Sequence, residues 1–392
     1  MTTLAPHDQR ALDYLRGLGE RPAAPFHESG PSRFIRDTLK ALGIRVRRDR
    51  YGNLIARYRN GEPKGPPVAF VAHMDHPGFE VVDVGGRSVG DAVVARVLGG
   101  VPVCSLNSPV PVLILLPDGR RVPALTNPQT RTPNPEPRTP VGRGGGQGGE
   151  RFVRLTLPIA TSMTPPLPVV FDLTDFSVAD GVIHMRALDD LAGCAAIISV
   201  LERLAFSEAD ADVYGVFTRA EEVGLYGARL MAAAKTLPRK AIVVSVESSS
   251  VIPGVSQGAG PVIRTGDAAW TFDAEAEQAL VAARNELRKS RSDFKAQRAL
   301  MSGGTCEATA FALAGYRTTG LAFPLANYHN ATTSIPDPDG GVDAESVHVS
   351  DFLDGVALLT GAALTIARGY EAPTRSRLGP VPEEARQRLE AG

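Results

Sequence analysis

Hydrophobic and polar positions divide the chain into three parts, of which the first and third show both helical and strand patterns. Near the start, leucines at helical spacing predict an amphipathic helix over Asp8–Leu18. The run Pro67–Ala72 is continuously apolar and is followed by polar residues, which is typical of a strand buried on both faces. The same stretch predicts a helix at Ser32–Leu42 and short strands at Ile44–Val46 and Asn53–Tyr58.

After Gly181 helical periods again alternate with short apolar runs. This alternation predicts an α/β fold with a mostly parallel central sheet flanked by helices. The expected helices are Asp189–Leu204, Leu225–Ala234, Ala274–Lys289, Thr305–Ala314 and Ser350–Ala367. The expected strands are Val213–Thr218, Ala241–Val246 and Thr318–Phe323.

The middle part lacks helical periodicity, and its short β-like runs alternate with Pro and Gly. We therefore expect a small β-rich domain at 82–181, inserted into a discontinuous catalytic α/β domain formed by 1–81 and 182–392. Within the insertion, 130–150 is rich first in Pro and then in Gly, which predicts a loop. The expected strands are Ala92–Leu98, Val110–Leu116, Phe152–Leu157 and Val169–Leu173.

The net charge argues against some classes of binding partner, and the cysteine spacing argues against disulfide bonds. The 42 Lys and Arg residues against 43 Asp and Glu give a net charge of −1, which argues against nucleic acid and against a polybasic membrane contact. The longest apolar stretch, near Ala192–Leu201, is too short to span a bilayer, and the first residues carry no apolar leader. We therefore expect a cytoplasmic protein. Cys104, Cys194 and Cys306 lie far apart, so a disulfide framework is not expected.

Histidine and acidic residues follow several of the expected strands or begin a helix. They are His73 and Asp75, the pair Asp189–Asp190, the pair Glu221–Glu222, Glu247 and His329. Taken singly, each also fits an ordinary role, such as a helix cap, a surface glutamate or a loop histidine. Strand ends of an open α/β sheet meet at one edge, and two histidines with three carboxylates suit a pair of zinc-class cations.

The ordered set of motifs resembles the co-catalytic zinc exopeptidases, and the local strings resemble metallopeptidase family 42, the TET, glutamyl and deblocking aminopeptidases. These strings are "AHMDHPGFEV", "RALDDLAG", "EEVGLYGA" and "GAGPVI". The resemblance implies an aminopeptidase that removes N-terminal residues from short peptides by a metal-bridged water and a glutamate base. It also implies two divalent metal ions, either zinc or the alternatives cobalt and manganese, and a homo-oligomer.

The resemblance also implies a role for each residue of the set. His73 and Glu247 would bind one metal, Glu222 and His329 would bind the other, and Asp189 would bridge both. Glu221 would be the general base, and Asp75 would orient His73. The peptide bond between Asp189 and Asp190 is expected to be cis.

Several positions depart from the family pattern. Glu247 stands where Asp is usual, Cys306–Glu307 replaces a usual Asp, and Asn330 replaces the residue usual after the second metal histidine. His76 also departs, and it is interpreted either as a substrate contact or as a solvated loop residue. These departures leave two alternatives open: a deacylase or carboxypeptidase with the same metal chemistry, and a non-catalytic binding or scaffold protein.

Overall fold

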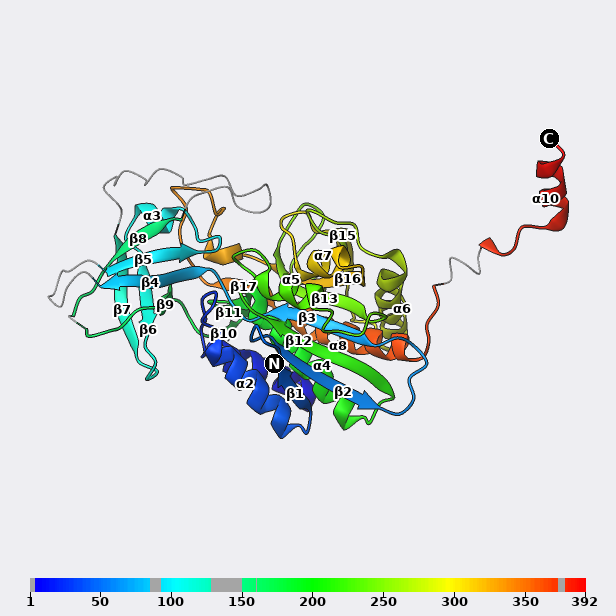
Figure 1. Cartoon of the computed structure of the whole chain (residues 1–392), viewed down its shortest axis with the longest axis horizontal. Helices are drawn as coiled ribbons and strands as arrows, with labels where there is room; N and C mark the ends of the chain where they lie inside the picture. Colours follow the sequence, from blue (N-terminus) through cyan, green and yellow to red (C-terminus); the bar gives the residue numbers. More distant parts are fainter. Residues whose placement is uncertain (1–3, 85–92, 128–149, 160, 373–377) are drawn as a thin grey trace.

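We describe a computed structural model of the chain, which covers residues 4–84, 93–127, 150–159, 161–372 and 378–392. The loop expected at 130–150 lies outside the described residues, apart from Glu150. A barrel lies at one end of the molecule and a larger α/β layer at the other (Figure 1).

An eight-stranded mixed sheet forms the centre of the α/β layer. Its order is β1 (Arg45–Arg48), β2 (Leu54–Asn60), β12 (Ala211–Thr218), β3 (Val68–His73), β13 (Ile242–Ser250), β16 (Arg317–Leu325), β14 (Val262–Gly266) and β15 (Gln297–Leu300). The four central strands β12, β3, β13 and β16 are parallel. β1 pairs antiparallel with β2, β2 with β12, and β14 with β16. The α/β prediction is confirmed, and the antiparallel pairs lie outside the parallel centre.

Helices cover both faces of the sheet, which explains why every residue of β3 is buried. Val68, Phe70 and Ala72 belong to the core cluster that also contains side chains of α4. The intervening Ala69 and Val71 belong to the cluster on the opposite face, with side chains of α5 and α7. The helices of this layer are α1 (Pro6–Gly19), α2 (Ser29–Ala41), α4 (Leu188–Phe206), α5 (Tyr226–Ala233), α6 (Ala274–Ser290), α7 (Glu307–Leu313) and α8 (Val349–Ala367).

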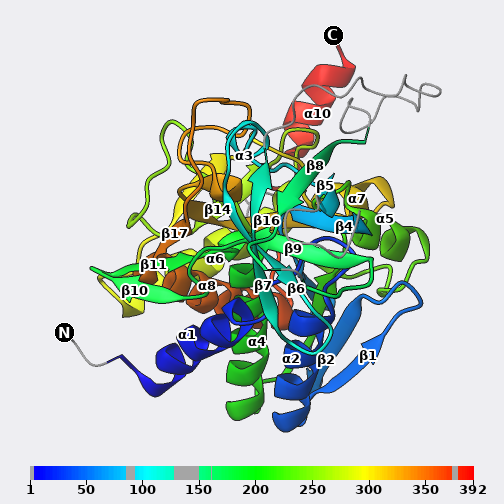
Figure 2. The same ribbon diagram turned by 90° about the vertical axis from the view of Figure 1, so that its left-hand side faces the viewer.

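The middle part of the chain forms a closed antiparallel barrel, which faces the viewer in Figure 2. Its order is β4 (Gly78–Val84), β5 (Val93–Leu98), β8 (Phe152–Thr156), β7 (Arg121–Asn127), β6 (Pro111–Leu115) and β9 (Leu167–Phe171), with α3 (Cys104–Asn107) between β5 and β6. Phe79 and Phe171 meet edge to face in its core, with ring centroids 5.6 Å apart. We propose that this barrel is the inserted domain.

Outside the barrel and the main sheet, a small sheet joins β10 (Ser177–Ala179), β11 (Val182–Met185) and β17 (Glu345–His348). α10 (Glu383–Glu390) buries no side chain and lies apart from the rest of the molecule in Figure 1.

Helix α8 corrects one expectation about the chain. By length and composition alone, α8 is long and apolar enough to cross a membrane, so the expectation that no segment reaches that length is wrong. Most of the helix is nevertheless buried in the α/β layer, where Phe352 packs against Phe323 of β16 with ring centroids 5.5 Å apart. A buried core helix of a soluble protein meets the same length and composition test.

Candidate metal centre

The carboxyl ends of the parallel strands deliver most of the predicted residues to one place. His73 is the last residue of β3, Glu247 lies near the end of β13, and His329 lies in a short 3₁₀ helix (Tyr328–Asn330) after β16. Glu221 and Glu222 follow β12, and Asp189 is the second residue of α4. Because β12, β3, β13 and β16 run in the same direction, these ends meet at one edge of the sheet.

The side chains form two groups that share Asp189. In the first, Nε2 of His73 lies 3.3 Å from Oδ1 of Asp189 and 4.0 Å from Oε2 of Glu247. In the second, Nε2 of His329 lies 3.7 Å from Oδ2 of Asp189 and 3.3 Å from Oε2 of Glu222. The two oxygens of Asp189 therefore face different histidines, which is the arrangement of a carboxylate that bridges two positions.

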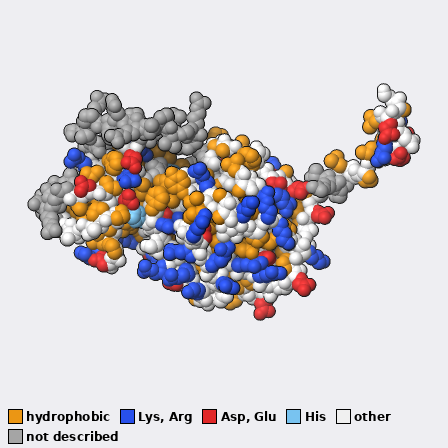
Figure 3. Space-filling view, in the orientation of Figure 1, with side chains coloured by type: hydrophobic (Ala, Val, Ile, Leu, Met, Phe, Trp, Pro, Cys, Tyr) orange, Lys and Arg blue, Asp and Glu red, His pale blue; other side chains and the backbone are white. Residues whose placement is uncertain are grey.

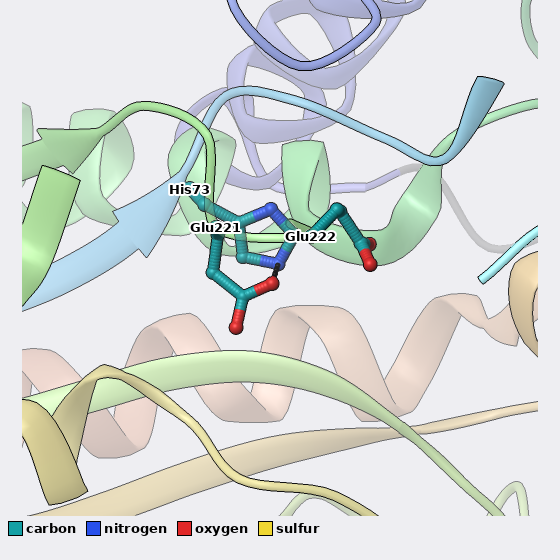
Figure 4. Close-up of side chains that lie close together, drawn as sticks. All are labelled: His73, Glu221 and Glu222. Carbon is teal, nitrogen blue, oxygen red and sulfur yellow. Dashed lines mark ion pairs between the residues drawn. The ribbon is translucent and has the colours of Figure 1, made fainter. Parts of the chain in front are cut away.

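Glu221 stands beside the first group. Its Oε2 lies 3.8 Å from Nε2 of His73, and Figure 4 shows its carboxylate directed towards that ring while Glu222 extends in a different direction. His73, Glu221 and Glu222 also come close enough together to count as a third group. The two adjacent glutamates thus extend in different directions from the same segment, so each can serve a different purpose.

The residues fit divalent cations. Oδ1 of Asp189, Oε1 of Glu222 and Nε2 of His329 are buried and have no hydrogen-bond partner among the described residues, and leaving such atoms unpaired is costly. With metal–ligand bonds of about 2.0–2.1 Å, tetrahedral geometry places neighbouring ligand atoms about 3.3 Å apart. The 3.3–4.0 Å separations in the two groups are close to that spacing, and nitrogen with carboxylate oxygen is a zinc-class ligand set.

Asp75 is positioned differently from the expectation that its carboxylate orients His73. Nδ1 of His73 donates to the backbone carbonyl of Asp75 at 2.9 Å, whereas the nearer carboxylate oxygen is 3.9 Å away. The carboxylate instead accepts the backbone N–H groups of Glu221 at 3.0 Å and Glu222 at 3.1 Å. Asp75 therefore contacts both the candidate base and a candidate ligand.

Glu345 supports the second group, although no motif pointed to it. It is fully buried, and its carboxylate accepts the backbone N–H groups of Asp189 and His329, each at 2.9 Å. It lies on β17, and the nearby Asp343 and His348 form no recognisable motif with it. Its role depends on contacts between distant segments, so the sequence held no local signal for it.

His76 is not a solvated loop residue. It is buried, its Nδ1 lies 2.5 Å from the backbone oxygen of Asp189, and its Nε2 lies 3.0 Å from Oδ1 of Asn330. Asn330 in turn donates to the carbonyl of Arg186 at 2.8 Å. Two of the departures from the family pattern, His76 and Asn330, thus contact each other behind Asp189. The peptide bond between Asp189 and Asp190 is cis, as expected.

Burial and neighbouring charges shift the pKa values of the ionisable residues in the centre. Burial raises the pKa of Glu221, Glu222 and Glu247 well above the ordinary value. Burial would lower the pKa of His73, but Glu221 and Asp189 outweigh it and raise that pKa. Burial lowers the pKa of His329 to about 4. Carboxylates crowded in this way ionise readily only when positive charge joins them, which a pair of cations would supply.

A pocket opens beside the first group of ligands. Besides the candidate ligands, its wall includes Ser249, Ile252, Arg264, Met301 and Tyr328. Arg264 is only 3% exposed, and its Nε and Nη1 are buried with no hydrogen-bond partner in the part of the chain that the structure describes. Burial opposes its charge, but neighbouring Cys306, Glu247 and Asp267 raise its pKa overall.

The buried cysteines near the centre are not activated. Burial raises the pKa of Cys306 to about 12, and its thiol lies 3.4 Å from Asp267. Burial also raises the pKa of Cys194, whose thiol donates to the backbone oxygen of His73 at 3.1 Å. A nucleophilic cysteine requires a lowered pKa, so neither has the character of a nucleophile.

The fold and the centre together define an α/β protein with a candidate site for two metal ions at the carboxyl edge of its sheet. A model of the M42 glutamyl aminopeptidase family matches residues 163–339, which confirms the predicted family resemblance. "Putative aminopeptidase SgcX" of Escherichia coli (strain K12) is 26% identical over 222 residues, which are 54% of this chain and 56% of the relative. A "Putative aminopeptidase" of Acetivibrio thermocellus is 28% identical over 166 residues. The matches span about half the length of each of these curated relatives.

Solved structures share the whole fold. The TET aminopeptidase of Thaumarchaeota archaeon SCGC AB-539-E09 gives a TM-score of 0.72 at 18% identity, over 92% of this chain and 99% of that chain. The TET1 peptidase of Pyrococcus horikoshii, described as assembling into a tetrahedron or a large octahedral shell, gives 0.69 at 23% identity, over 90% and 99%. At sequence identities of 18% and 23%, this structural similarity establishes the fold alone.

Proposed function

We propose that the chain is a two-metal aminopeptidase that hydrolyses the N-terminal residue from short peptides. The observation that carries the proposal is the pair of three-ligand groups that share Asp189, with Glu221 beside them. His73, Asp189 and Glu247 would hold one ion, and Asp189, Glu222 and His329 would hold the other. The names of the family and of the curated relatives support the same reaction class.

The chain's own residues supply the proton transfers. Two zinc-class ions at this centre would polarise the peptide carbonyl and acidify a water molecule. Glu221 would accept a proton from that water and pass it to the departing amine, because its carboxylate faces His73 and belongs to neither of the two groups that share Asp189. Asp75 would hold Glu221 in place through the backbone N–H at 3.0 Å.

Arg264 supports a preference for substrates that carry a carboxylate. Its buried guanidinium lines the pocket beside the centre, and two of its donors find no acceptor among the residues that the structure describes; a carboxylate is the natural acceptor for them. An acidic N-terminal side chain would meet this need, in line with the word "glutamyl" in the family description. In the test, Arg264→Met should reduce kcat/KM about 10- to 100-fold for an N-terminal glutamate peptide and leave an N-terminal leucine peptide nearly unchanged. Equal losses on both peptides would contradict the preference.

The central experiment compares free-amine peptides with the same peptides acetylated at the N-terminus, on metal-reconstituted protein of measured metal content. Cleavage of the free-amine set alone supports the aminopeptidase. Cleavage of the acetylated set alone would favour the deacylase or carboxypeptidase alternative, and cleavage of neither would favour a non-catalytic protein.

A pair of variants tests the base. Glu221→Gln should keep its metal ions and lose about 100- to 10,000-fold in kcat. Glu286→Gln changes an exposed glutamate on α6 in the same way and should keep full activity. Retained activity in Glu221→Gln would refute the assignment of the base.

Three further properties belong to the proposal. We propose zinc as the native metal, a homo-oligomer as the assembled form, and the cytoplasm as the location. The assembly is supported by similar structures described as a dodecamer and as a tetrahedron or large octahedral shell. Metal analysis, light scattering after gel filtration, and cell fractionation test these properties in turn.

A further inference from the structure

The two ligand groups differ in what supports them. In the first group, His73 donates its Nδ1 proton to the backbone carbonyl of Asp75, two residues beyond the end of β3, and Glu247 accepts from Ser245 of its own strand at 3.0 Å. Both supports lie in the α/β layer. In the second group, His329 lies in the same layer, but Nδ1 of His329 meets the carbonyl of Gly100, 3.0 Å away. Gly100 follows β5, which is a barrel strand.

The contact with Gly100 decides how His329 presents its other nitrogen. A histidine that binds a metal through Nε2 carries its proton on Nδ1, and an acceptor for that proton fixes both the tautomer and the ring plane. Gly100 provides that acceptor for His329. The fit is tight, because a Cβ added at Gly100 would lie 2.7 Å from Nδ1 of His329.

The neighbouring glycine contacts the other ligand of the same group. A Cβ at Gly99 would lie 3.2 Å from Cβ and 3.3 Å from the backbone oxygen of Glu222. The turn Gly99–Gly100 therefore lies against Glu222 and His329 alike. Its position is fixed from the barrel side, because Arg151, just before β8, donates to the carbonyl of Gly99 at 3.1 Å.

A second connection holds the barrel against the segment that follows His329. The backbone N–H of Val103 donates to the carbonyl of Ile335 at 2.8 Å. Ile335 also lies near Gly100, since its Cδ1 would be 3.6 Å from an added Cβ there. The barrel thus reaches the second ligand group through the glycine turn and through the segment beside it.

We infer that the turn Gly99–Gly100 is a positioning element for the second metal position, so that the barrel sets the affinity of that position and leaves the first unaffected. The inference rests on the proposed function, since it requires two bound ions. Neither glycine touches substrate in this scheme. They act through His329 and Glu222.

The test is a metal-binding measurement that needs no substrate. Metal-free wild type and Gly100→Ala are titrated with Co²⁺ alone, and binding is followed by calorimetry and by the visible absorption of the bound ion. Wild type should take up two ions. Gly100→Ala should keep one at unchanged affinity and bind the other about 10- to 100-fold more weakly, the usual cost of losing a support behind a metal ligand.

Two further variants control for folding. Gly361→Ala adds the same methyl group inside α8, 3.4 Å from Cβ of Ala283, and should bind both ions like wild type. Arg151→Ala removes an exposed support of the turn without adding atoms, and should weaken the same ion by a smaller factor. This second variant keeps the inference testable if Gly100→Ala does not fold.

The outcomes separate this inference from the proposed function. Two ions bound with unchanged affinity by both Gly100→Ala and Arg151→Ala would overturn the inference alone, as would an equal loss at both positions. A wild-type chain that binds fewer than two ions would overturn the proposed function and this inference together. A chain that binds two ions in the expected pattern but cleaves no peptide would support the inference and refute the aminopeptidase.

Discussion

Replacing Asp75 by asparagine would test whether this residue acts through Glu221 and Glu222 or through His73. Each carboxylate oxygen of Asp75 accepts one backbone N–H, from Glu221 at 3.0 Å and from Glu222 at 3.1 Å. An asparagine keeps one oxygen and turns its amide nitrogen towards the other N–H group. One buried donor is then left without an acceptor.

The structure gives the size of the effect. Asp75 is fully buried, so water cannot replace the missing acceptor, and an unsatisfied buried donor costs about 1–3 kcal/mol. We expect Asp75→Asn to lower the free energy of unfolding of the metal-free protein by about 2 kcal/mol. We expect kcat to fall about 10- to 100-fold as Glu221 loses its fixed position.

Denaturant unfolding of the metal-free chains and steady-state kinetics of the reconstituted ones measure the two effects. Asp118→Asn, an exposed change in the turn between β6 and β7, should alter stability by less than about 0.5 kcal/mol. The reasoning is refuted if Asp75→Asn has wild-type stability and wild-type kcat. It is also refuted if kcat falls while the backbone amide signals of Glu221 and Glu222 stay unchanged by NMR.

Three further predictions concern the cysteine, the second histidine and the metal ions. Because burial raises the pKa of Cys306 to about 12, a thiol-alkylating reagent near about pH 8 should leave it unmodified in the folded protein, and rapid labelling by mass spectrometry would contradict this. Because burial lowers the pKa of His329 from 6.5 to about 4, the unfolded chain binds a proton that the folded chain does not. The metal-free protein should therefore lose stability as the pH falls from about 6.5 to about 4, and His329→Gln should reduce this loss. If the denaturation midpoint of wild type and that of His329→Gln change equally with pH, the lowered pKa of His329 is refuted. Removal of the ions by a chelator should lower the melting temperature and zinc should restore it, since a ligand at about 100 times its Kd adds about 2.7 kcal/mol, whereas an unchanged melting temperature would exclude tightly bound ions.

The sequence predicted the central strands and the candidate ligands for one physical reason. A strand buried on both faces, such as β3, is continuously apolar and ends abruptly at its first polar residue, which here is His73. The same transition follows the apolar runs of β12 and β13, so Glu221 and Glu247 could be recognised in the same way.

Other parts of the structure could not be predicted, because the sequence shows no such transition from apolar to polar residues there. β14 and β15 were not expected, since their short runs mix apolar residues with Arg264 and Arg298 and resemble loops. Glu345 and Gly100 matter through contacts with His329, and these contacts join segments far apart in the chain. Hydrophobic periodicity reports which face of an element is buried, and it cannot report which distant backbone group lies against it.

The outer strand of the large sheet carries positive charge that opposes strand pairing with a second copy of the chain. β1 occupies the edge of the sheet and carries exposed Arg45, Arg47 and Arg48, and Figure 3 shows Lys and Arg side chains gathered on this part of the α/β layer. An unpaired edge offers free backbone groups to any extended chain. A second copy that paired along β1 would bring its own arginines against these, so repulsion protects this edge from strand addition at the high concentrations at which aggregation begins.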